Sequence, residues 1–273
     1  MNTKAAEIFA NEGITECACI PFSDSEVLFP HYMPEDAVKS VIVFLVPYRT
    51  ADKPEDGYGI SCYARVKDYH GYMKGLFERL TKPLSEAVGG RVYGFSDRSP
   101  LNEKLCAARA GLGVIGRNSL LINRRYGSYV FIGVFLSTSE PEDEEKASVQ
   151  CPVCGECSKA CPGGAINDFG IDAQKCLSGL SQKKKLTEEE QKKLTDNRIC
   201  WGCDVCQNVC PLNADTEYSH IGYFTNTFLS RLSPEVIASM SDEEFSMCAF
   251  SWRGKETIIR NMIAADKAKN SEK

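Results

Sequence analysis

Two cysteine runs with the same spacing, C-x2-C-x2-C-x3-C-P, are the residues of this chain best suited to chemistry. They comprise Cys151, Cys154, Cys157 and Cys161, and Cys200, Cys203, Cys206 and Cys210. Three thiolates at three-residue steps surround one [4Fe-4S] cluster, whereas the fourth, placed before proline, reaches a second cluster. Two such runs are typical of bacterial two-cluster ferredoxins. Zinc is the alternative, but structural zinc sites take cysteines in C-x2-4-C pairs, which fits these triplets poorly.

A ninth cysteine, Cys176, lies between the runs, so two clusters that take eight thiolates leave one cysteine over. If the runs exchange their fourth cysteines, as in ferredoxins, two ligand sets result: Cys151, Cys154, Cys157 and Cys210, and Cys161, Cys200, Cys203 and Cys206. Spacing alone leaves Cys176 and Cys200 as alternatives for the eighth position. The other five cysteines are scattered, as buried small hydrophobic residues usually are.

The composition limits the compartment and the kinds of partner. The chain has 273 residues, and its 32 basic and 37 acidic residues give a formal net charge of -5. Any contact with nucleic acid must therefore come from a local basic patch. No apolar run is long enough for a membrane span or a signal peptide, so we expect a cytoplasmic protein without a membrane partner. In a reducing compartment, cysteines serve as metal ligands more often than as disulfides.

Iron–sulfur clusters pass electrons singly, so residues 1–140 are expected to supply a further chemistry. The pattern G-x-G-x-x-G occurs there at Gly111, Gly113 and Gly116. A nicotinamide-binding fingerprint needs a strand before the glycines, whereas residues 102–110 are helical in character. The glycines instead favour close approach of the backbone to a large planar or phosphate-bearing cofactor.

The stretch from Lys104 to Arg125 is the local basic patch of the chain, because it contains no acidic residue. Its five basic residues are Lys104, Arg109, Arg117, Arg124 and Arg125. Such a patch is either a solvated face or a contact for the phosphates of a cofactor or substrate.

Asp97 lies just upstream, between an expected strand and an expected helix. One interpretation makes it the N-cap of that helix. The other makes it a proton donor at the edge of the sheet where the sites of α/β proteins tend to lie.

The elements that position these residues are expected to form an α/β arrangement. Short apolar runs predict strands over residues 40–47, 91–95 and 129–136. Apolar residues at helical spacing predict helical stretches over residues 61–88 and 100–110. Together they indicate a sheet with helices on its faces.

The acidic segment 139–148 has no hydrophobic period and is interpreted as a linker. We therefore expect an α/β (α+β) domain over residues 1–140 and a ferredoxin-like, two-cluster domain over residues 149–215. A short helical C-terminal segment over residues 216–273 completes the expected organisation.

These residues occur in the order typical of one protein family. The order is Asp97-x-x-Pro100-Leu101-x-Glu103-Lys104, then Ala108 to Asn118, Leu121-Ile122-Asn123, Tyr126-Gly127-Ser128 and both cysteine runs. Over roughly residues 35–265 the chain resembles epoxyqueuosine reductase. The resemblance implies a cobalamin-dependent enzyme with two [4Fe-4S] clusters, which reduces the epoxide of epoxyqueuosine in tRNA to give queuosine.

The resemblance also implies roles for particular residues. Asp97 matches the general acid that protonates the departing oxygen. The N-terminal domain becomes a corrinoid-binding domain, whose contacts with cobalamin include Arg109, Gly111, Gly113, Gly116, Arg117 and Asn118. The two implied ligand sets are Cys151, Cys154, Cys157 and Cys210, and Cys161, Cys176, Cys203 and Cys206.

Full-length members of the family continue into a helical-repeat domain that helps to hold tRNA, and this sequence ends before such a domain. The expected substrate is therefore tRNA or a queuosine-related small molecule. Electrons are expected from an external donor of the flavodoxin or ferredoxin type. The alternatives are an electron-transfer protein that reduces the corrinoid of a partner enzyme, and a corrinoid reductase such as a reductive dehalogenase that acts on another small molecule.

Overall fold

The computed structural model describes residues 3–141, 150–168 and 170–271, with side chains up to residue 268. Its contacts divide the chain into two compact units. The first unit comprises Met1–Pro47, Tyr69–Gly116 and Leu120–Pro152, and the second comprises Tyr48–Asp68, Arg117–Ser119 and Val153–Lys273. Most of the expected linker, residues 142–148, lies outside the described residues, and the domain limits placed there remain a prediction.

The first unit is built on an antiparallel sheet, whose four strands in the described residues run in the order β1-β2-β7-β4. The strands are β1 (Cys17–Pro21), β2 (Ser40–Pro47), β7 (Val130–Ser137) and β4 (Val92–Phe95). The three predicted strands are confirmed to within one residue at each end. β1 was not predicted.

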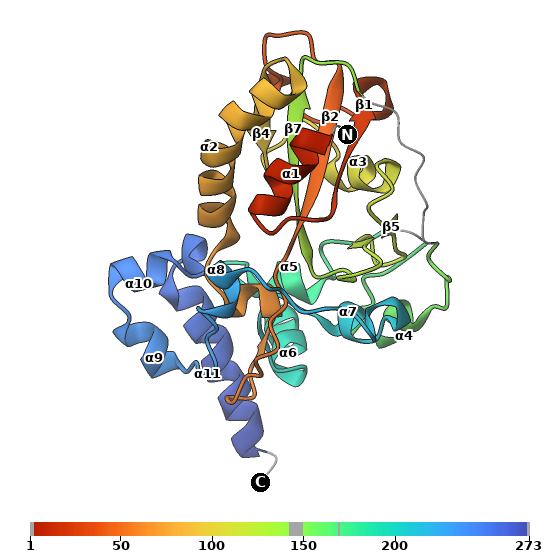
Figure 1. The fold of residues 1–273 in the computed structure, drawn as a ribbon. Helices are drawn as coiled ribbons and strands as arrows, with labels where there is room; N and C mark the ends of the chain where they lie inside the picture. Colours follow the sequence, from red (N-terminus) through yellow and green to blue (C-terminus); the bar gives the residue numbers. More distant parts are fainter. Residues whose placement is uncertain (1–2, 142–149, 169, 272–273) are drawn as a thin grey trace. The chain divides into compact units, whose positions relative to one another are not determined.

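Helices cover both faces of this sheet (Figure 1). All eight residues of β2 are buried, and successive side chains point to opposite faces. Phe44 contacts the rings of Phe9 in α1 (Thr3–Asn11) and Phe77 in α2 (Tyr69–Val88). Its neighbour Val43 belongs to the core on the other face, which includes residues of α3 (Glu103–Arg109). A strand buried on both faces explains the unbroken apolar run in the sequence.

Helix α2 begins at Tyr69, eight positions later than the predicted helical stretch. Its buried residues Met73, Leu76, Leu80 and Leu84 keep the spacing that predicted it. The preceding residues instead form a short 3-10 helix, η3 (Cys62–Arg65), and belong to the second unit. The prediction failed there because periodicity does not reveal which unit a segment packs against.

The segment Tyr48–Asp68 joins the second unit through long-range contacts, although the sequence analysis assigned it to the N-terminal domain. Strand β3 (Gly59–Ile60) pairs in parallel with β8 (Ile199–Trp201). The buried guanidinium of Arg65 forms an ion pair with Asp56 at 2.8 Å, and the ends of both side chains are enclosed within this unit.

The rest of the second unit is mainly helical. Its α-helices are α4 (Glu156–Ala160), α5 (Leu177–Ser181), α6 (Glu188–Asp196), α7 (Val205–Asn208), α8 (Gly222–Thr225), α9 (Pro234–Ser239), α10 (Asp242–Ser246) and α11 (Lys255–Ser271). Ile258 and Met262 of α11 pack with Trp201 and Phe250 in one core. None of the helices in the described ranges has the length and apolarity needed to cross a bilayer.

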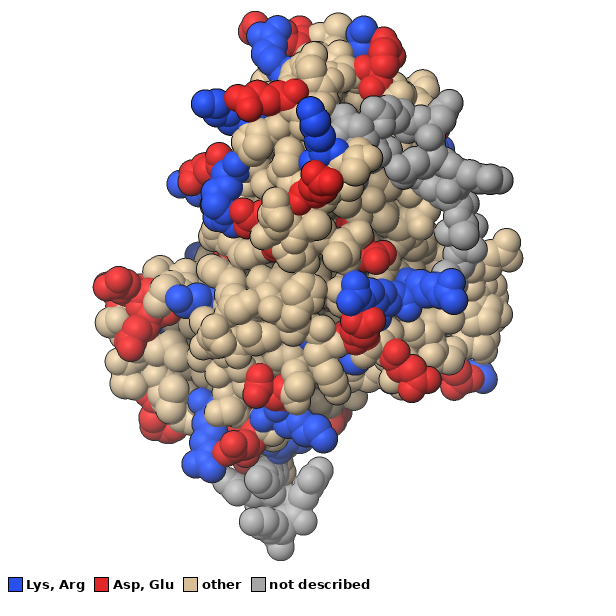
Figure 2. Space-filling view, viewed as in Figure 1, with Lys and Arg blue, Asp and Glu red and all other residues tan. Residues whose placement is uncertain are grey.

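Short elements complete both units. A hairpin of β5 (Val114–Ile115) and β6 (Leu121–Ile122) follows α3. The remaining 3-10 helices are η1 (Phe22–Asp24), η2 (Pro30–Tyr32), η4 (Pro211–Asn213) and η5 (Ser251–Arg253). Basic and acidic side chains are interspersed over the face shown in Figure 2, in keeping with the small net charge of -5.

Candidate active site and cluster sites

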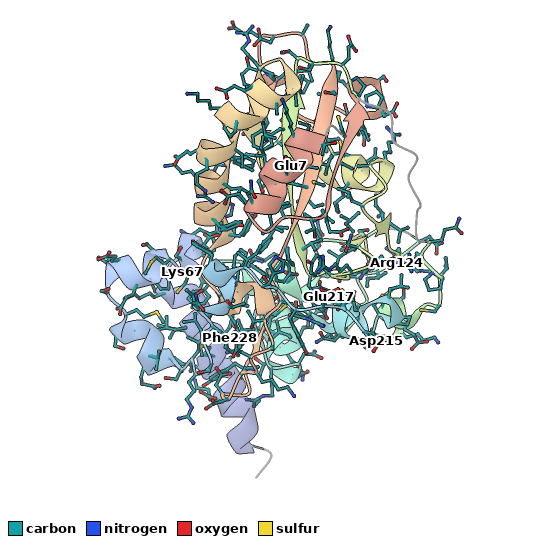
Figure 3. The ribbon with its side chains drawn as sticks, viewed as in Figure 1. Glu7, Lys67, Arg124, Asp215, Glu217 and Phe228 are labelled. Carbon is teal, nitrogen blue, oxygen red and sulfur yellow. The ribbon has the colours of Figure 1, made fainter. Side chains whose placement is uncertain are left out.

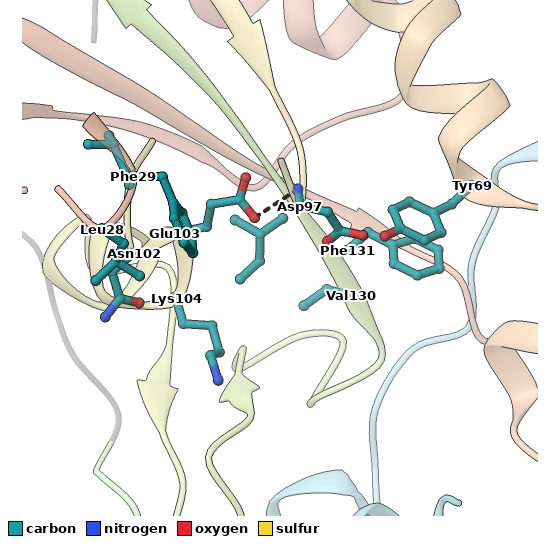
Figure 4. Close-up of a pocket in the computed structure, with 11 residues that line it drawn as sticks. Leu28, Phe29, Tyr69, Asp97, Asn102, Glu103, Lys104, Val130 and Phe131 are labelled. Carbon is teal, nitrogen blue, oxygen red and sulfur yellow. Dashed lines mark hydrogen bonds between the residues drawn. The ribbon is translucent and has the colours of Figure 1, made fainter. Parts of the chain in front are cut away.

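A cavity of about 340 Å³ lies in the first unit, beside the ends of β4 and β7 and the start of α3 (Figure 4). Its walls are mostly apolar, and its polar groups are few. The lining residues are Leu28, Phe29, Tyr69, Asp97, Leu101, Asn102, Glu103, Lys104, Val130, Phe131 and Ile132. An apolar hollow with a few convergent polar groups is the usual form of a small-molecule site.

Asp97 enters this cavity from the loop between β4 and α3. Its backbone is left-handed, with φ +62°, a conformation that Asp tolerates better than most residues. Its side chain points toward Tyr69 and Phe131 (Figure 4), and its Oδ2 lies 3.4 Å from Nε2 of His70. The N-cap interpretation of Asp97 is wrong, because the side chain of Asn102 accepts the hydrogen bond from Leu105 N and caps α3.

Glu103 lines the cavity, and the sequence analysis quoted it in the family motif without giving it a role. Its Oε2 accepts a hydrogen bond from the backbone amide of Asp97 at 3.3 Å. Burial, followed by the nearby carboxylate of Asp97, raises the pKa of Glu103 to about 8. In the sequence it looked like an ordinary acidic residue in the first turn of a helix. The sequence feature that could have indicated a role for Glu103 is its position six residues after Asp97.

Stacked aromatic rings form one wall of the cavity. The ring of Tyr69 lies parallel to that of Phe131, with centroids 3.9 Å apart and an interplanar angle of 12°. On the opposite side, the amides of Leu28 and Phe29 both donate to the carbonyl of Pro100, which ties this wall to the Asp97 loop. The cavity is therefore bounded on two sides by packed, hydrogen-bonded segments.

The glycine pattern does not form a nicotinamide fingerprint, because helix α3 precedes it and a hairpin follows it. Gly111 has φ +71°, which favours glycine. A Cβ atom on Gly113 would lie 2.6 Å from the carbonyl oxygen of Ile122. The absence of a side chain at Gly113 is thus explained by packing within the hairpin, and Gly116 N donates to Leu120 O in the same hairpin.

Several basic residues of this stretch have protein partners. Arg109 donates to the carbonyl of Asp24, and Nη2 of Arg117 lies 2.5 Å from a carboxylate oxygen of Asp168. Nε of Arg117 is buried and has no hydrogen-bond partner among the described residues. Asn118 is also buried. Arg124 projects from the chain at the position labelled in Figure 3.

The two cysteine runs adopt the same local structure. In each, the third cysteine lies in a short helix, Cys157 in α4 and Cys206 in α7, and these helices pack together. The fourth cysteine of each, Cys161 or Cys210, is extended, as the residue before proline must be. The amide of Ala165 lies 3.3 Å from Sγ of Cys161, a type of contact that stabilises thiolate ligands of clusters.

Four thiols of the second unit lie close enough to influence one another electrostatically. Cys206 is close enough to Cys161, Cys176 and Cys203 for their charges to affect it. Burial, followed by the other cysteines, raises the pKa of Cys206 to about 12. No three His, Cys, Asp or Glu side chains in the described part of the chain converge on a single metal ion.

Cys200 lies apart from this group. It is fully buried in the core with Trp201 and Met262, and its thiol donates to the carbonyl of Arg198. Burial raises its pKa to about 12, and the charged groups that affect it are Arg198, Asp266, Asp56 and Arg65. Cys176 is thus among the thiols that affect Cys206, and Cys200 is not named among them.

The first predicted ligand set is divided by the unit boundary. Cys154, Cys157 and Cys210 belong to the second unit, and Cys154 is the exposed member. Cys151 belongs to the first unit, whose last residue is Pro152.

A second cavity, of about 330 Å³, lies in the second unit and is lined mainly by apolar side chains, with Lys67 and Phe228 among its residues (Figure 3). None of the predicted site residues lines it.

The chain combines two ferredoxin-type cysteine runs with a cavity that contains an aspartate. These features are typical of an iron–sulfur protein that also has a small-molecule site. Comparison with protein families supports both parts. Residues 150–213 match the 4Fe-4S double cluster binding domain, and residues 32–97 match the family described as Epoxyqueuosine reductase QueG, DUF1730.

Curated relatives identify the family. The epoxyqueuosine reductase of Leadbetterella byssophila is 40% identical over 186 residues, which cover 66% of this chain and 60% of the relative. That of Lactococcus garvieae is 32% identical over 254 residues, which cover 88% of this chain and 72% of the relative. The chain belongs to the epoxyqueuosine reductase family. It spans about three-fifths of the length of several relatives, for example 62% of that from Bacillus subtilis.

Solved structures show the same relationship. The epoxyqueuosine reductase of Streptococcus thermophilus has a TM-score of 0.83 at 25% identity, with 98% of this chain and 82% of that chain covered. An epoxyqueuosine reductase in complex with an epoxyqueuosine-modified tRNA-Tyr stem loop has a TM-score of 0.82 at 26% identity, with 96% and 79% covered. A catabolic reductive dehalogenase, at 17% identity and a TM-score of 0.53, shares the fold alone.

Proposed function

We propose that this chain is an oxidoreductase that removes the epoxide oxygen of epoxyqueuosine and yields queuosine. The reaction takes up two electrons and two protons and releases the oxygen as water. The observation that carries the proposal is the cavity in which Asp97 stands among stacked aromatic and aliphatic walls. Family membership and the two-cluster domain support the reductive half of the chemistry.

Asp97 is proposed as the general acid. It stands at the cavity surface beside His70, where its carboxyl group can reach a bound substrate and protonate the departing oxygen. Lys104 adds a positive charge at the same cavity.

The cluster ligands are proposed as two sets of four. The first set is Cys151, Cys154, Cys157 and Cys210, and the second set is Cys161, Cys176, Cys203 and Cys206. The electrostatic influence of Cys161 and Cys176 on both Cys203 and Cys206 supports the second set. The matching local structures of α4 and α7 support the exchange of Cys161 and Cys210 between the runs.

Cobalamin is the proposed second cofactor, and residues 1–140 are the proposed corrinoid-binding domain. The contacts are proposed to come from Arg109, Gly111, Gly113, Gly116, Arg117 and Asn118. The buried Nε of Arg117 is an unused donor that fits the amide and phosphate groups of a corrinoid. When bound, cobalamin supplies a low-valent cobalt able to deliver two electrons to a C–O bond. Gly113 lies against Ile122 and can contribute backbone atoms alone.

The substrate is proposed to be epoxyqueuosine within tRNA, with the free nucleoside as the small-molecule alternative. The tRNA stem loop present in one related structure supports the first choice. The electron donor is proposed to be a flavodoxin or ferredoxin, and the compartment the cytoplasm.

The proposal is tested with anaerobically reconstituted protein, a chemical reductant and cobalamin. We expect about eight irons and one cobalamin per chain, and conversion of epoxyqueuosine-containing tRNA that is detected as queuosine by mass spectrometry of nucleosides. The free nucleoside is assayed in parallel. A protein that binds both cofactors but converts neither form would contradict the proposal. Iron binding without retained cobalamin would favour an electron-transfer protein.

A further inference from the structure

Asp204 lies between two proposed cluster ligands, Cys203 and Cys206, and its side chain does not have the role that its position suggests. It is the N-cap residue of α7, where an aspartate usually accepts a hydrogen bond from the first turn of the helix. The Asp204 side chain makes no such bond among the described residues. It is directed instead at residues 61 and 62, in the segment Tyr48–Asp68 of the same unit.

Three donors converge on the Asp204 carboxylate. The hydroxyl of Ser61 donates to Oδ1 at 2.5 Å, the backbone amide of Cys62 donates to Oδ2 at 2.7 Å, and Nε2 of Gln207 donates to Oδ1 at 2.9 Å. Ser61 and Gln207 are buried. All three donors are uncharged, so they orient the carboxylate without supplying a counter-charge.

Backbone packing holds the same part of the loop. The amide of Ser61 donates to the carbonyl of Trp201 at 2.8 Å. A Cβ atom on Gly202 would lie 2.5 Å from Cβ of Ser61, and the φ of Gly202 is +65°, a conformation that favours glycine. The chain just before Cys203 therefore lies tightly against Ser61. Packing and hydrogen bonds together fix the position of the Asp204 carboxylate relative to this loop.

The negative charge of Asp204 acts on the cysteines on both sides of it. Burial is the largest influence that raises the pKa of Cys203 to about 11 and that of Cys206 to about 12, and the Asp204 carboxylate contributes in the same direction to both. A carboxylate that disfavours the thiolate form of a neighbouring cysteine also disfavours further negative charge at the same place. An electron added to a cluster that these thiolates hold is such a charge.

We propose that Asp204 is a fixed negative charge that lowers the reduction potential of the cluster held by Cys161, Cys176, Cys203 and Cys206. The net charge around a cluster is one of the quantities that set its potential, and a carboxylate opposes the uptake of an electron. The inference rests on the proposed second ligand set. A lower potential makes reduced protein a stronger electron donor, which the proposed reduction of cobalamin requires.

The test is a redox titration of anaerobically reconstituted protein, followed by EPR and made without substrate. The signal of the second cluster is identified as the one that disappears in Cys176→Ala. Asp204→Asn keeps the shape of the side chain and removes its charge. We expect its iron content to stay at about eight per chain. The potential of the second cluster should become more positive by about three- to tenfold in the one-electron equilibrium constant, or about 30 to 60 mV.

Two further variants separate the charge of Asp204 from a merely structural role. Ser61→Ala removes one donor and leaves the charge, so the potential of the second cluster should shift slightly to more negative values. A structural disturbance of the loop would instead move Ser61→Ala and Asp204→Asn in the same direction. Asp196→Asn removes an exposed carboxylate from α6 of the same unit and should leave the potential unchanged, because exposed charges are screened.

The inference is overturned if the second-cluster potential of Asp204→Asn is equal to or below that of wild-type protein, or if Ser61→Ala shows the same positive shift. If Asp204→Asn loses this cluster, Ser61→Ala decides: a potential below that of wild-type protein supports the role of the charge, and a potential at or above it overturns that role. Wild-type protein that holds about four irons would overturn the ligand set and this inference together. Protein that holds both clusters but converts no epoxyqueuosine would contradict the proposed function alone.

Discussion

Nε2 of His70 lies 3.4 Å from Oδ2 of Asp97, so the proposed acid has a partner that can itself be charged. The ring of His70 also packs on Tyr69, which in turn stacks on Phe131 of the cavity wall. The pair is exposed, and a surface ion pair is worth less than about 1 kcal/mol. His70 therefore orients Asp97 weakly, and proton donation by Asp97 to the substrate is expected to be the larger contribution.

Replacement of Asp97 should separate these two contributions. Asp97→Asn removes the proton donor and keeps the shape, so we expect kcat to fall at least about a hundredfold. His70→Gln keeps a hydrogen-bonding side chain and should lower kcat less than about fivefold. Both rates are measured at saturating substrate. Iron and cobalamin content serve as controls, and an Asp97→Asn variant with normal turnover would remove Asp97 from the mechanism.

The assignment of the eighth cluster ligand is tested by iron content. Cys176→Ala should lose one cluster, so that iron falls from about eight to about four per chain. Cys200→Ala should keep its iron and lose roughly 1 kcal/mol of stability through a small cavity in the core around Trp201. The reverse outcome, with iron lost in Cys200→Ala and kept in Cys176→Ala, would contradict the proposed set.

The fold could be predicted where a buried element is a continuous apolar segment of the sequence. β2 is buried at all eight positions, and its residues form a continuous apolar segment. β1 escaped prediction because Cys17–Pro21 is short and rich in cysteine. The place of Tyr48–Asp68 could not be predicted, because it depends on pairing between β3 and β8, which are far apart in the sequence.

The candidate site could likewise be predicted only where a local sequence pattern indicates the chemistry. The cysteine runs were predicted as cluster ligands because residue type and spacing alone indicate their chemistry, whereas the predicted role of Asp97 as general acid came from the family resemblance. Glu103 was not found, because its altered acidity arises from burial by the fold and from Asp97 across the loop. Cys200 and Cys176 could not be distinguished by spacing, because the core that encloses Cys200 includes Met262 of the distant helix α11.

The buried ion pair of Arg65 and Asp56 should be essential for the second unit. Asp56→Asn leaves a buried guanidinium without its counter-ion, which we expect to cost about 3–5 kcal/mol of unfolding free energy. Burial raises the pKa of Asp56, but hydrogen bonds from Arg65 and from backbone amides outweigh it and lower the pKa below 3.8. The contribution of Asp56 is therefore present at neutral pH and is lost as the pH falls through this lowered pKa.

Denaturant unfolding measures the effect, and a neighbouring pair provides the control. Glu55 forms an exposed ion pair with Arg231 at 2.6 Å. Glu55→Gln should change the unfolding free energy by less than about 1 kcal/mol. Equal effects of Asp56→Asn and Glu55→Gln would refute the importance of the buried pair.

Gly113 offers a test of why the glycine pattern is present. Gly113→Ala places Cβ 2.6 Å from the carbonyl of Ile122, and we expect a loss of roughly 2 kcal/mol because backbone must shift. Gly75→Ala is the matched control in α2, where the nearest atom belongs to the flexible side chain of Arg79 at 3.2 Å. It should stabilise the protein by up to about 1 kcal/mol, because alanine favours helix. Thermal unfolding of both variants without cobalamin measures packing alone, and a neutral Gly113→Ala would leave cofactor contact as its explanation.

Glu103 should also make the stability of the protein depend on pH in a defined direction. Its pKa is raised in the folded protein from 4.5 to about 8, so between these values the folded state binds the proton more tightly than the unfolded state does. Stability should therefore be lost as the pH rises through this window. Glu103→Gln cannot ionise, and its advantage over the wild-type protein should grow by roughly 2 kcal/mol between pH 6 and pH 8 and level off above pH 8. Denaturant unfolding at several pH values, with Glu86→Gln at an exposed position of α2 as control, measures this difference, and a constant difference between pH 6 and pH 9 would mean that Glu103 ionises like an exposed acid.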